Sequence, residues 1–324
     1  MPTIFDVPPQ NVQSDLDALA AALDAQIPPK NDDNLLIATW NIRAFASLTR
    51  EWTAQGSDSP KRDLRGLRAI ITILSRFDVI AIQEVKGDLR ALRDTLHFLG
   101  QDWTFLMTDV NTSEEGNDER LAFLFNLKRV KPSGLAAELV VPQDRLDRIG
   151  ENALKTQFAR TPYAVSFLRK ETTFILVTLH ILYGKVEADR LPELQEIANW
   201  MLNWAKSSNK FHHNLLVMGD FNIDRKDSPG LQAFTSTGLM VPDELINLPR
   251  TIFDKPDVPN DDAYYDQIAW FKTGKQALIN MTVLQGSSFN FMPYVYTELN
   301  MSDNAISYRI SDHLPLWIEF GINQ

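Results

Sequence analysis

The stretch Leu35-Leu36-Ile37-Ala38-Thr39-Trp40 is an apolar run of strand length that ends on an amide residue, Asn41. A second run of this kind, Asp78–Gln83, ends on Glu84. Between them, residues 63–76 carry apolar side chains at helical spacing. The succession predicts a strand, a helix and a second strand, with a polar residue at the end of each strand.

Six further apolar runs also have polar residues at one end. Two of them end on such residues: Phe174–Leu179 on His180, and Leu215–Gly219 on Asp220-Phe221-Asn222. In the other four the polar residues come first: Glu119-Arg120 before Leu121–Phe125, Arg160 before Tyr163–Leu168, Asp266 before Ile268–Phe271, and Asp312-His313 before Leu314–Phe320. If strands of both directions mix in a sheet, these ends and beginnings share one edge. Such an edge has the composition of a metal-assisted phosphate-ester site.

Each polar end taken alone has a simpler explanation, because Asp and Asn commonly leave a strand and begin a turn. The residue types favour a functional edge instead. A purely structural rim would consist mostly of Gly, Ser, Lys and Pro. Here two of the five histidines lie at strand ends, beside or among carboxylates.

The chain has 324 residues and no Gly/Ser-rich or Pro-rich linker, which favours one main domain over residues 34–324. Residues 1–33 are predicted to form an N-terminal helical extension. In it, Ser14 would cap a short helix with an apolar face of Leu16, Leu19, Ala20 and Leu23, ended by Pro28-Pro29. Its expected role is packing against the domain.

Composition excludes several classes of protein. The chain has no cysteine, which excludes disulfide frameworks, thiolate nucleophiles and Cys-type zinc sites. Its net charge of -10 argues against broad attraction to polyanions but leaves room for a nuclease with local Arg and Lys residues. With no signal-peptide pattern and no apolar run of membrane-spanning length, we expect a cytoplasmic protein without a stable protein partner.

The remaining pattern predicts two packed sheets with helices outside. Arg90–Leu99 and Leu191–Lys206 have helical spacing. Further strands are expected at Leu139–Val141, Phe289–Met292 and the closing run, and polar loops at Asn111–Glu119 and Asp224–Asp266.

The strand ends suggest particular metal ligands. Mg²⁺ is commonly held by one or two carboxylates together with waters and substrate oxygens. Glu84 would be the anchor, with Asn41 or Asp312 assisting. The oxygen-rich set favours Mg²⁺, Mn²⁺ or Ca²⁺ over zinc.

Phosphodiester hydrolysis also needs proton transfer and stabilisation of phosphate charge. His180 and His313 suit proton transfer near neutral pH. On an extended backbone Asp220 and Asn222 would face the same side, so both are expected to position water and phosphate. Arg160 would stabilise the phosphate charge. Of the other histidines, His97 is expected in the core or at its boundary, and His212-His213 in a solvated loop.

With these residues assembled, the chain resembles the endonuclease/exonuclease/phosphatase superfamily, and within it the deoxyribonuclease I-like branch. The matching strings occur in family order over residues 35–320. They are Thr39-Trp40-Asn41-Ile42-Arg43, Ile82-Gln83-Glu84-Val85-Lys86, Glu119-Arg120-Leu121-Ala122-Phe123-Leu124-Phe125, Arg160-Thr161-Pro162, Leu179-His180, Gly219-Asp220-Phe221-Asn222, Tyr265-Asp266-Gln267-Ile268 and Ser311-Asp312-His313.

The resemblance implies an α+β fold, a four-layer α/β/β/α sandwich of two packed mixed sheets flanked by helices. It implies a Mg²⁺-dependent site with Glu84 as metal ligand and Asn41 and Asp312 close to it. It also implies two oriented acid/base pairs, His180 with Glu119 and His313 with Asp266. By position, Asp220 and Asn222 would handle water and phosphate. Arg160, Arg43 and Lys86 would contact substrate phosphates.

The implied function is a DNA endonuclease that hydrolyses phosphodiester bonds. A tyrosine that this branch places two residues before the Glu119 equivalent is Asn117 here, which removes one contact to DNA. A phosphoesterase for phospholipid head groups or inositol phosphates is the alternative, for which Phe289–Tyr296 is a candidate membrane loop, although a buried segment is favoured. A catalytically dead binding module is less favoured, because every expected position is filled. RNA as substrate, endo- or exo-action, the number of metals and the oligomeric state stay open.

Overall fold

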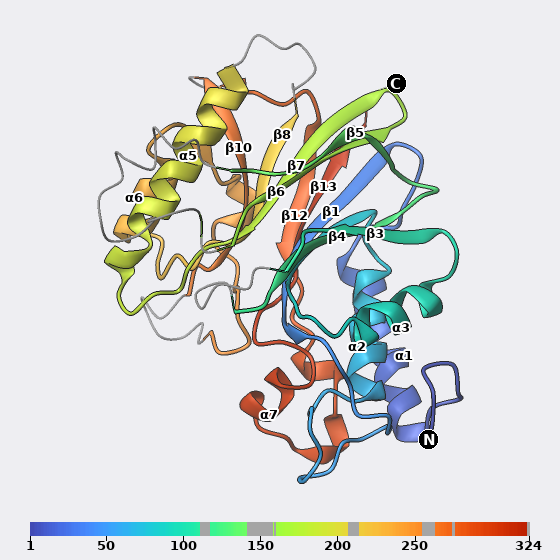
Figure 1. Cartoon of the computed structure of the whole chain (residues 1–324). Helices are drawn as coiled ribbons and strands as arrows, with labels where there is room; N and C mark the ends of the chain where they lie inside the picture. Colours follow the sequence, from blue (N-terminus) through green and yellow to red (C-terminus); the bar gives the residue numbers. More distant parts are fainter. Residues whose placement is uncertain are drawn as a thin grey trace.

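The computed structural model describes residues 1–110, 117–140, 158, 160–206, 214–254, 263–273 and 276–322. Two mixed sheets form its centre (Figure 1). The first has the order β12 (Thr282–Ser288), β13 (Leu316–Gly321), β1 (Asn34–Phe45), β2 (Val79–Val85), β4 (Arg120–Asn126) and β3 (Trp103–Met107). The second has the order β11 (Gln276–Ala277), β10 (Asp266–Thr273), β8 (Leu215–Asp220), β7 (Thr172–His180), β6 (Tyr163–Arg169) and β5 (Lys131–Glu138), with β9 (Leu239–Met240) beside β10.

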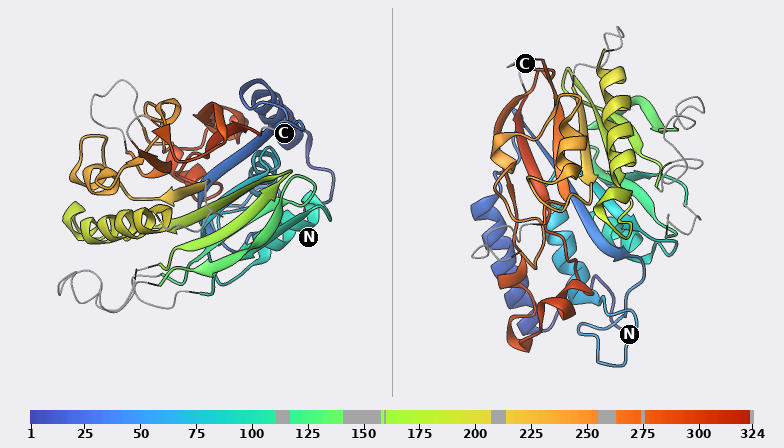
Figure 2. Two further views of the ribbon diagram at one scale, coloured as in Figure 1. Left: turned by 90° about the horizontal axis from the view of Figure 1, so that it is seen from above. Right: turned by 90° about the vertical axis from the view of Figure 1, so that its left-hand side faces the viewer.

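Helices cover both outer faces of the sheet pair. In the right-hand view of Figure 2, α1 (blue) and α5 (yellow) lie on opposite sides of the sheets. The α-helices are α1 (Gln10–Gln26), α2 (Leu64–Leu74), α3 (Arg90–Leu99), α5 (Leu191–Lys206), α6 (Pro229–Thr235) and α7 (Asp303–Ser307). Short 3-10 helices are η1 (Glu187–Asp189), η2 (Asp243–Leu245), η3 (Met292–Tyr294) and η4 (Thr297–Leu299). The expected four-layer α/β/β/α sandwich is therefore confirmed.

Alternation along the strands builds this layering, because successive side chains of a strand face opposite sides. In β1, Leu35 and Ile37 join the core between the sheets, whereas Leu36 and Ala38 pack in the core beneath α1 and α2. Because both faces of the inner strands lie in a core, these strands are continuous apolar runs in the sequence.

One parallel pair in each sheet brings polar residues to a common edge. β1 runs parallel to β2, and β7 runs parallel to β8, so that His180 lies opposite Asp220. The antiparallel neighbours begin where these strands end: Asp220 pairs with Asp266, and Val85 with Arg120. The shared edge predicted from the polar strand ends is thus present.

Several local predictions were wrong. Helix α1 begins at Gln10, not near Ser14, because Pro9 supplies a carbonyl to Gln13 and needs no N–H itself; Ser14 instead donates to the carbonyl of Gln10 inside the helix. His97 is exposed on α3 rather than at the core. His212 and His213 lie outside the described residues.

The β-rich later part also departs from expectation. Phe289–Met292 is not a strand: it follows β12 and leads into η3. Leu139 and Val140 follow the end of β5, and Val141 lies outside the described residues. Residues 224–266 are more than a polar loop, since they contain α6, whose Ser228-Pro229 start is a recognisable helix signal. The burial of Phe289, Phe291, Val295 and Tyr296 agrees with the favoured interpretation of Phe289–Tyr296 as a buried segment and contradicts the membrane loop.

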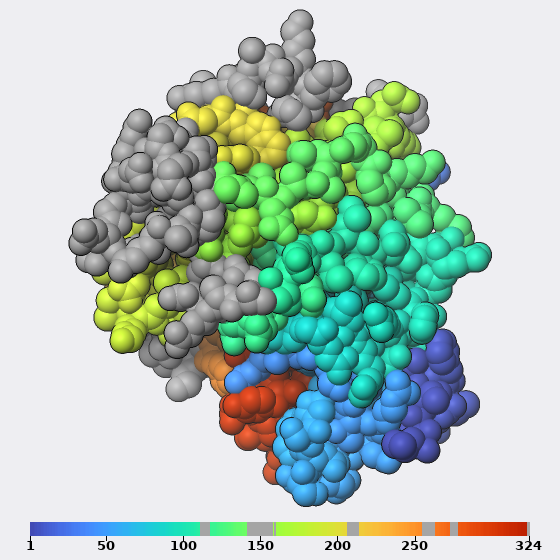
Figure 3. Space-filling view, viewed as in Figure 1, coloured from blue at the N-terminus to red at the C-terminus, as the bar shows by residue number. Residues whose placement is uncertain are grey.

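Helix α1 is packed closely onto the domain. Its Leu19 and Leu23 are fully buried against the α2 side of the first sheet, and its Asp15 lies 2.5 Å from the Arg65 guanidinium. Figure 3 shows the dark-blue N-terminal residues forming a continuous surface with their light-blue and teal neighbours. No helix among the described residues combines the length and apolar character needed to cross a membrane.

We propose that residues 1–33 stabilise the domain and take no part in its chemistry. Leu19→Ala should therefore lower the free energy of unfolding by about 2–5 kcal/mol, because it leaves a cavity beneath α1. Urea unfolding followed by fluorescence measures this loss. Folded Leu19→Ala protein should keep the turnover of the wild type; a reduced kcat would show that the extension shapes the site.

Candidate active site

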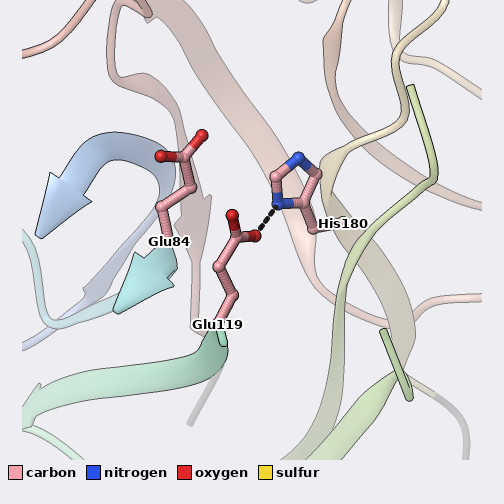
Figure 4. Close-up of side chains that lie close together, drawn as sticks. All are labelled: Glu84, Glu119 and His180. Atoms are coloured by element: carbon pink, nitrogen blue, oxygen red, sulfur yellow. Dashed lines mark ion pairs between the residues drawn. The ribbon is translucent and has the colours of Figure 1, made fainter. Parts of the chain in front are cut away.

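The first histidine pair of the site is His180 with Glu119. His180 ends β7 in the second sheet, while Glu119 precedes β4 in the first, and His180 Nδ1 lies 3.0 Å from Glu119 Oε2. Figure 4 shows this ion pair, with Glu84 beside Glu119. Both members are buried. The pairing predicted from the resemblance is present in the structure.

Glu119 is surrounded by cations and donors. Its Oε2 lies 2.5 Å from Arg160 Nε, and its Oε1 accepts from Lys86 Nζ at 2.9 Å and from Asn117 Nδ2 at 2.7 Å. Burial acts to raise the pKa of Glu119. The contacts with His180, Arg160 and Lys86 nevertheless hold that pKa well below its ordinary value. Glu119 is therefore an anion that orients the His180 ring.

Asn117 belongs to the site in a way that the sequence did not indicate. In the sequence it is notable only for standing where the deoxyribonuclease I-like branch has a tyrosine. In the structure its side chain binds Glu119, and its backbone carbonyl accepts from Lys86 Nζ at 2.7 Å. The signal available in the sequence was its position two residues before Glu119.

The second histidine pair is His313 with Asp266. His313 Nδ1 lies 2.6 Å from Asp266 Oδ2, across the gap between the start of β13 and the start of β10. Burial raises the pKa of Asp266 to about 6. Burial acts to lower the pKa of His313, but Asp266 and Asp220 raise it to about 10. Between these values the pair holds an imidazolium against a carboxylate.

Asp220 lies between the two histidines. Its Oδ2 is 3.5 Å from His180 Nε2 and 3.8 Å from His313 Nε2, and it accepts from Asn41 Nδ2 at 3.0 Å. Burial acts to raise the pKa of Asp220, but the two histidines keep that pKa below its ordinary value. The Nε2 atoms of both rings thus converge on one buried carboxylate.

The preceding glycine makes this convergence possible. Gly219 has φ +136°, and a Cβ there would lie 2.1 Å from the backbone oxygen of Leu179 on β7. Any other residue would force β8 away from β7, and with it Asp220 from His180. The Gly219-Asp220 order is therefore required by the close approach of the two strands.

Asn222 does not lie on an extended backbone with Asp220. β8 ends at Asp220, and Asn222 has φ +50°. Its side-chain Nδ2 donates to the carbonyl of Ile181 at 2.7 Å, and its backbone N–H donates to Asp220 Oδ1 at 2.9 Å. The prediction that Asn222 and Asp220 face the same side of an extended strand was wrong, because the chain turns after β8. The backbone N–H of Asn222 instead fixes the Asp220 carboxylate.

The metal candidates lie along the end of the first sheet. β1 continues past Asn41 to Phe45, so Asn41 lies within the strand and not at its tip. Glu84 Oε2 accepts from the backbone N–H of Ala44 at 2.8 Å. Glu84, Glu119 and His180 offer donor atoms that all lie within 4.8 Å of one another. Because Glu119 and His180 already bind each other, Glu84 is the member of this group best suited to a cation.

Asn41 supplies an independent sign of a cation. Its Oδ1 is buried and accepts no hydrogen bond from any described residue, while its Nδ2 is held by Asp220. A buried acceptor left without a partner costs about 1–3 kcal/mol. A hard divalent ion beside Glu84 and Asn41 would satisfy it, so the residues present fit such an ion.

Asp312 and Arg43 form a neighbouring pair. Arg43 Nη1 lies 3.4 Å from Asp312 Oδ2, and its guanidinium stacks 3.9 Å from the Tyr308 ring centroid. Ser311 joins this pair to the rest: its hydroxyl donates to the Asn41 carbonyl at 2.6 Å and accepts from the backbone N–H of His313 at 3.0 Å. Like Arg43, the other two predicted phosphate contacts, Lys86 and Arg160, already hold a carboxylate partner.

Comparison with known proteins agrees with this geometry. Residues 38–277 match the model of the Endonuclease/Exonuclease/phosphatase family. A "Deoxyribonuclease" of Thioalkalivibrio sp. (strain K90mix) is 29% identical over 211 residues, which span 64% of this chain and only 51% of that protein. "Deoxyribonuclease-1" of Bos taurus is 24% identical over 298 residues, 87% of this chain and 91% of the bovine protein.

A solved structure shows the same fold. The endonuclease/exonuclease/phosphatase family protein from Bacteroides thetaiotaomicron superposes with a TM-score of 0.57 at 16% identity, covering 90% of this chain and 95% of that one. Together with the two deoxyribonuclease relatives, the family match identifies a hydrolase that acts on phosphate esters. The chain therefore belongs to the endonuclease/exonuclease/phosphatase family, in its deoxyribonuclease I-like branch.

Proposed function

We propose that the chain is a Mg²⁺-dependent DNA endonuclease that hydrolyses phosphodiester bonds with two histidine–carboxylate pairs. The observation that carries the proposal is the convergence of His180 Nε2 and His313 Nε2 on Asp220. A phosphoryl group placed there would meet an acid/base group on each side, as an in-line displacement requires. The two relatives named as deoxyribonucleases support DNA as the substrate.

The histidines divide the proton transfers between them. His313, kept protonated by Asp266 and Asp220, donates its Nε2 proton to the leaving oxygen as the O–P bond breaks. On the other side, Asp220 aligns the attacking water, and His180 accepts the proton that this water loses. Glu119 and Asp266 keep the two rings oriented through their Nδ1 atoms.

The cation belongs at Glu84 and Asn41, with Asp312 assisting. Mg²⁺ is favoured by the oxygen donors, and Mn²⁺ or Ca²⁺ suit the same set. When bound, a divalent ion neutralises phosphate charge and polarises a phosphate oxygen. Arg160, Arg43 and Lys86 border the site and are proposed to meet phosphates of the substrate once it displaces part of their present contacts.

The proposal is tested with a panel of substrates. Supercoiled plasmid, single-stranded RNA, an abasic duplex, inositol phosphates and sphingomyelin vesicles are each incubated with Mg²⁺ and with EDTA. We expect plasmid nicking in Mg²⁺ and none in EDTA. Hydrolysis of the inositol phosphates and of sphingomyelin should be slow at most. Faster hydrolysis of inositol phosphate or sphingomyelin than of plasmid would contradict DNA as the substrate.

The His313 pair predicts a pH dependence. A histidine whose pKa rises on folding stabilises the protein fully below its unfolded value of about 6.5 and loses that stabilisation as the pH passes its folded value. For His313 this stabilisation is lost as the pH rises through about 10. Asp266→Asn should lower the pKa of His313, so this loss moves to lower pH. Titration of the His313 imidazole by NMR in metal-free protein measures the shift, and an unchanged pKa would contradict the pairing.

A further inference from the structure

Arg62 is a buried arginine whose guanidinium donates hydrogen bonds to four backbone carbonyls. It is 2% exposed and donates to Ala44 O at 2.7 Å, Arg43 O at 2.6 Å, Ile310 O at 3.0 Å and Arg309 O at 3.2 Å. These carbonyls belong to two segments, the end of β1 and the stretch that enters Ser311-Asp312-His313. A buried cation is costly unless its donors are satisfied, and these four bonds occupy four of the five guanidinium N–H groups.

One of these bonds acts on the peptide group that holds Glu84. The carbonyl of Arg43 and the N–H of Ala44 belong to the same planar peptide unit. Arg62 Nη2 donates to the carbonyl oxygen of this peptide unit, and the N–H of the same unit donates to Glu84 Oε2 at 2.8 Å. The orientation of this single peptide therefore links the Arg62 guanidinium to the Glu84 carboxylate. A charged donor on the oxygen also strengthens the N–H as a donor.

The backbone at this point is strained and needs support. Ala44 has φ +45° and Glu84 has φ +62°, conformations that cost a non-glycine residue of the order of 1–2 kcal/mol. β1 and β2 change register between Asn41 and Phe45, so the ladder does not fix the peptide there. Arg62, bound to the carbonyls on both sides of the Ala44 Cα, supplies the missing constraint.

We propose that Arg62 is a positioning residue for the Glu84 carboxylate and, through it, for the divalent cation; this rests on the function proposed above. Its bonds to Arg309 and Ile310 also tie the Asp312 segment to the end of β1. Arg62 thus sets the distance between the two parts of the site that offer oxygen ligands. It acts through Glu84 and touches neither substrate nor cation.

The test compares Arg62→Lys with Arg169→Lys by measuring Mn²⁺ affinity with electron paramagnetic resonance. Lysine keeps the charge but not the planar fork that reaches several carbonyls. Arg169 is a matched control: it is 7% exposed and donates to the carbonyls of Asn31, Asp32 and Arg129, beyond the opposite end of β1. We expect Arg62→Lys to bind Mn²⁺ about 10–100-fold more weakly than wild type, and Arg169→Lys to match wild type.

A second measurement uses the wild-type protein, in case Arg62→Lys does not fold. In NMR spectra recorded during a Mg²⁺ titration, the Ala44 amide and the Arg62 Nε–H should shift along the same binding curve, while Arg169 Nε–H stays unchanged. Equal Mn²⁺ affinity in wild type and Arg62→Lys, or no shift at Ala44 and Arg62 when Mg²⁺ binds, would overturn the role of Arg62 alone. Wild-type protein that binds neither ion would overturn the proposed metal dependence as well.

Discussion

Glu84→Gln should lower the rate of phosphodiester cleavage by at least about 100-fold while the protein remains folded. The substitution keeps the shape of the side chain but removes the anionic oxygen that a hard dication prefers. Changes to residues that merely orient a ligand already cost about 10–100-fold, and here the anchor itself is altered. Cleavage kinetics across a series of Mg²⁺ concentrations measure the effect.

The control for this variant is its folding. Glu84 is only half-buried, and the glutamine oxygen can still accept the hydrogen bond that the Ala44 N–H donates to Glu84. The circular dichroism spectrum and the melting temperature should therefore resemble those of the wild type. Wild-type turnover by Glu84→Gln at low Mg²⁺ would show that the cation binds elsewhere.

His180→Ala and His313→Ala should each reduce kcat by about 10²–10⁴-fold, the usual contribution of a positioned acid or base. Each ring has its own carboxylate. His180 faces Asp220 from the end of β7 and His313 from the segment before β13, so neither can replace the other. Steady-state kinetics on a plasmid or a small diester measure the loss. His97→Ala is the control, because His97 is exposed on α3.

The pattern of losses separates a chemical role from a structural one. A comparable collapse in His97→Ala, or near-normal kcat in either His180→Ala or His313→Ala, would contradict the placement of the acid/base pairs. The double variant should lose less than the product of the single losses, since both groups act on the same displacement.

Much of the site could be predicted because its residues lie at strand ends. Continuous apolar runs with a polar residue at one end are visible in the sequence, and sheet geometry then places His180, Asp220 and Asp266 side by side. The helices α3 and α5 were predicted with their observed bounds, because helical spacing identifies amphipathic segments directly.

The parts that sequence reasoning missed depend on single contacts across the fold. Arg62 follows a polar stretch, and nothing periodic distinguishes it from an exposed residue, yet it is buried against four carbonyls. The turn at Asn222 is held by a hydrogen bond from its side-chain amide to the carbonyl of Ile181, which directly follows β7. The apolar run at Phe289–Met292 is buried by packing as irregular chain, which local composition does not separate from a strand.

We propose that a divalent cation and the two histidine pairs together cleave DNA internally. The most direct test incubates wild-type protein with covalently closed circular plasmid in Mg²⁺, in EDTA, and in EDTA followed by excess Mg²⁺. We expect conversion to open circles in Mg²⁺, none in EDTA, and recovery when Mg²⁺ is restored. Undiminished nicking in EDTA, or an intact circle in Mg²⁺ while linear ends are degraded, would contradict it.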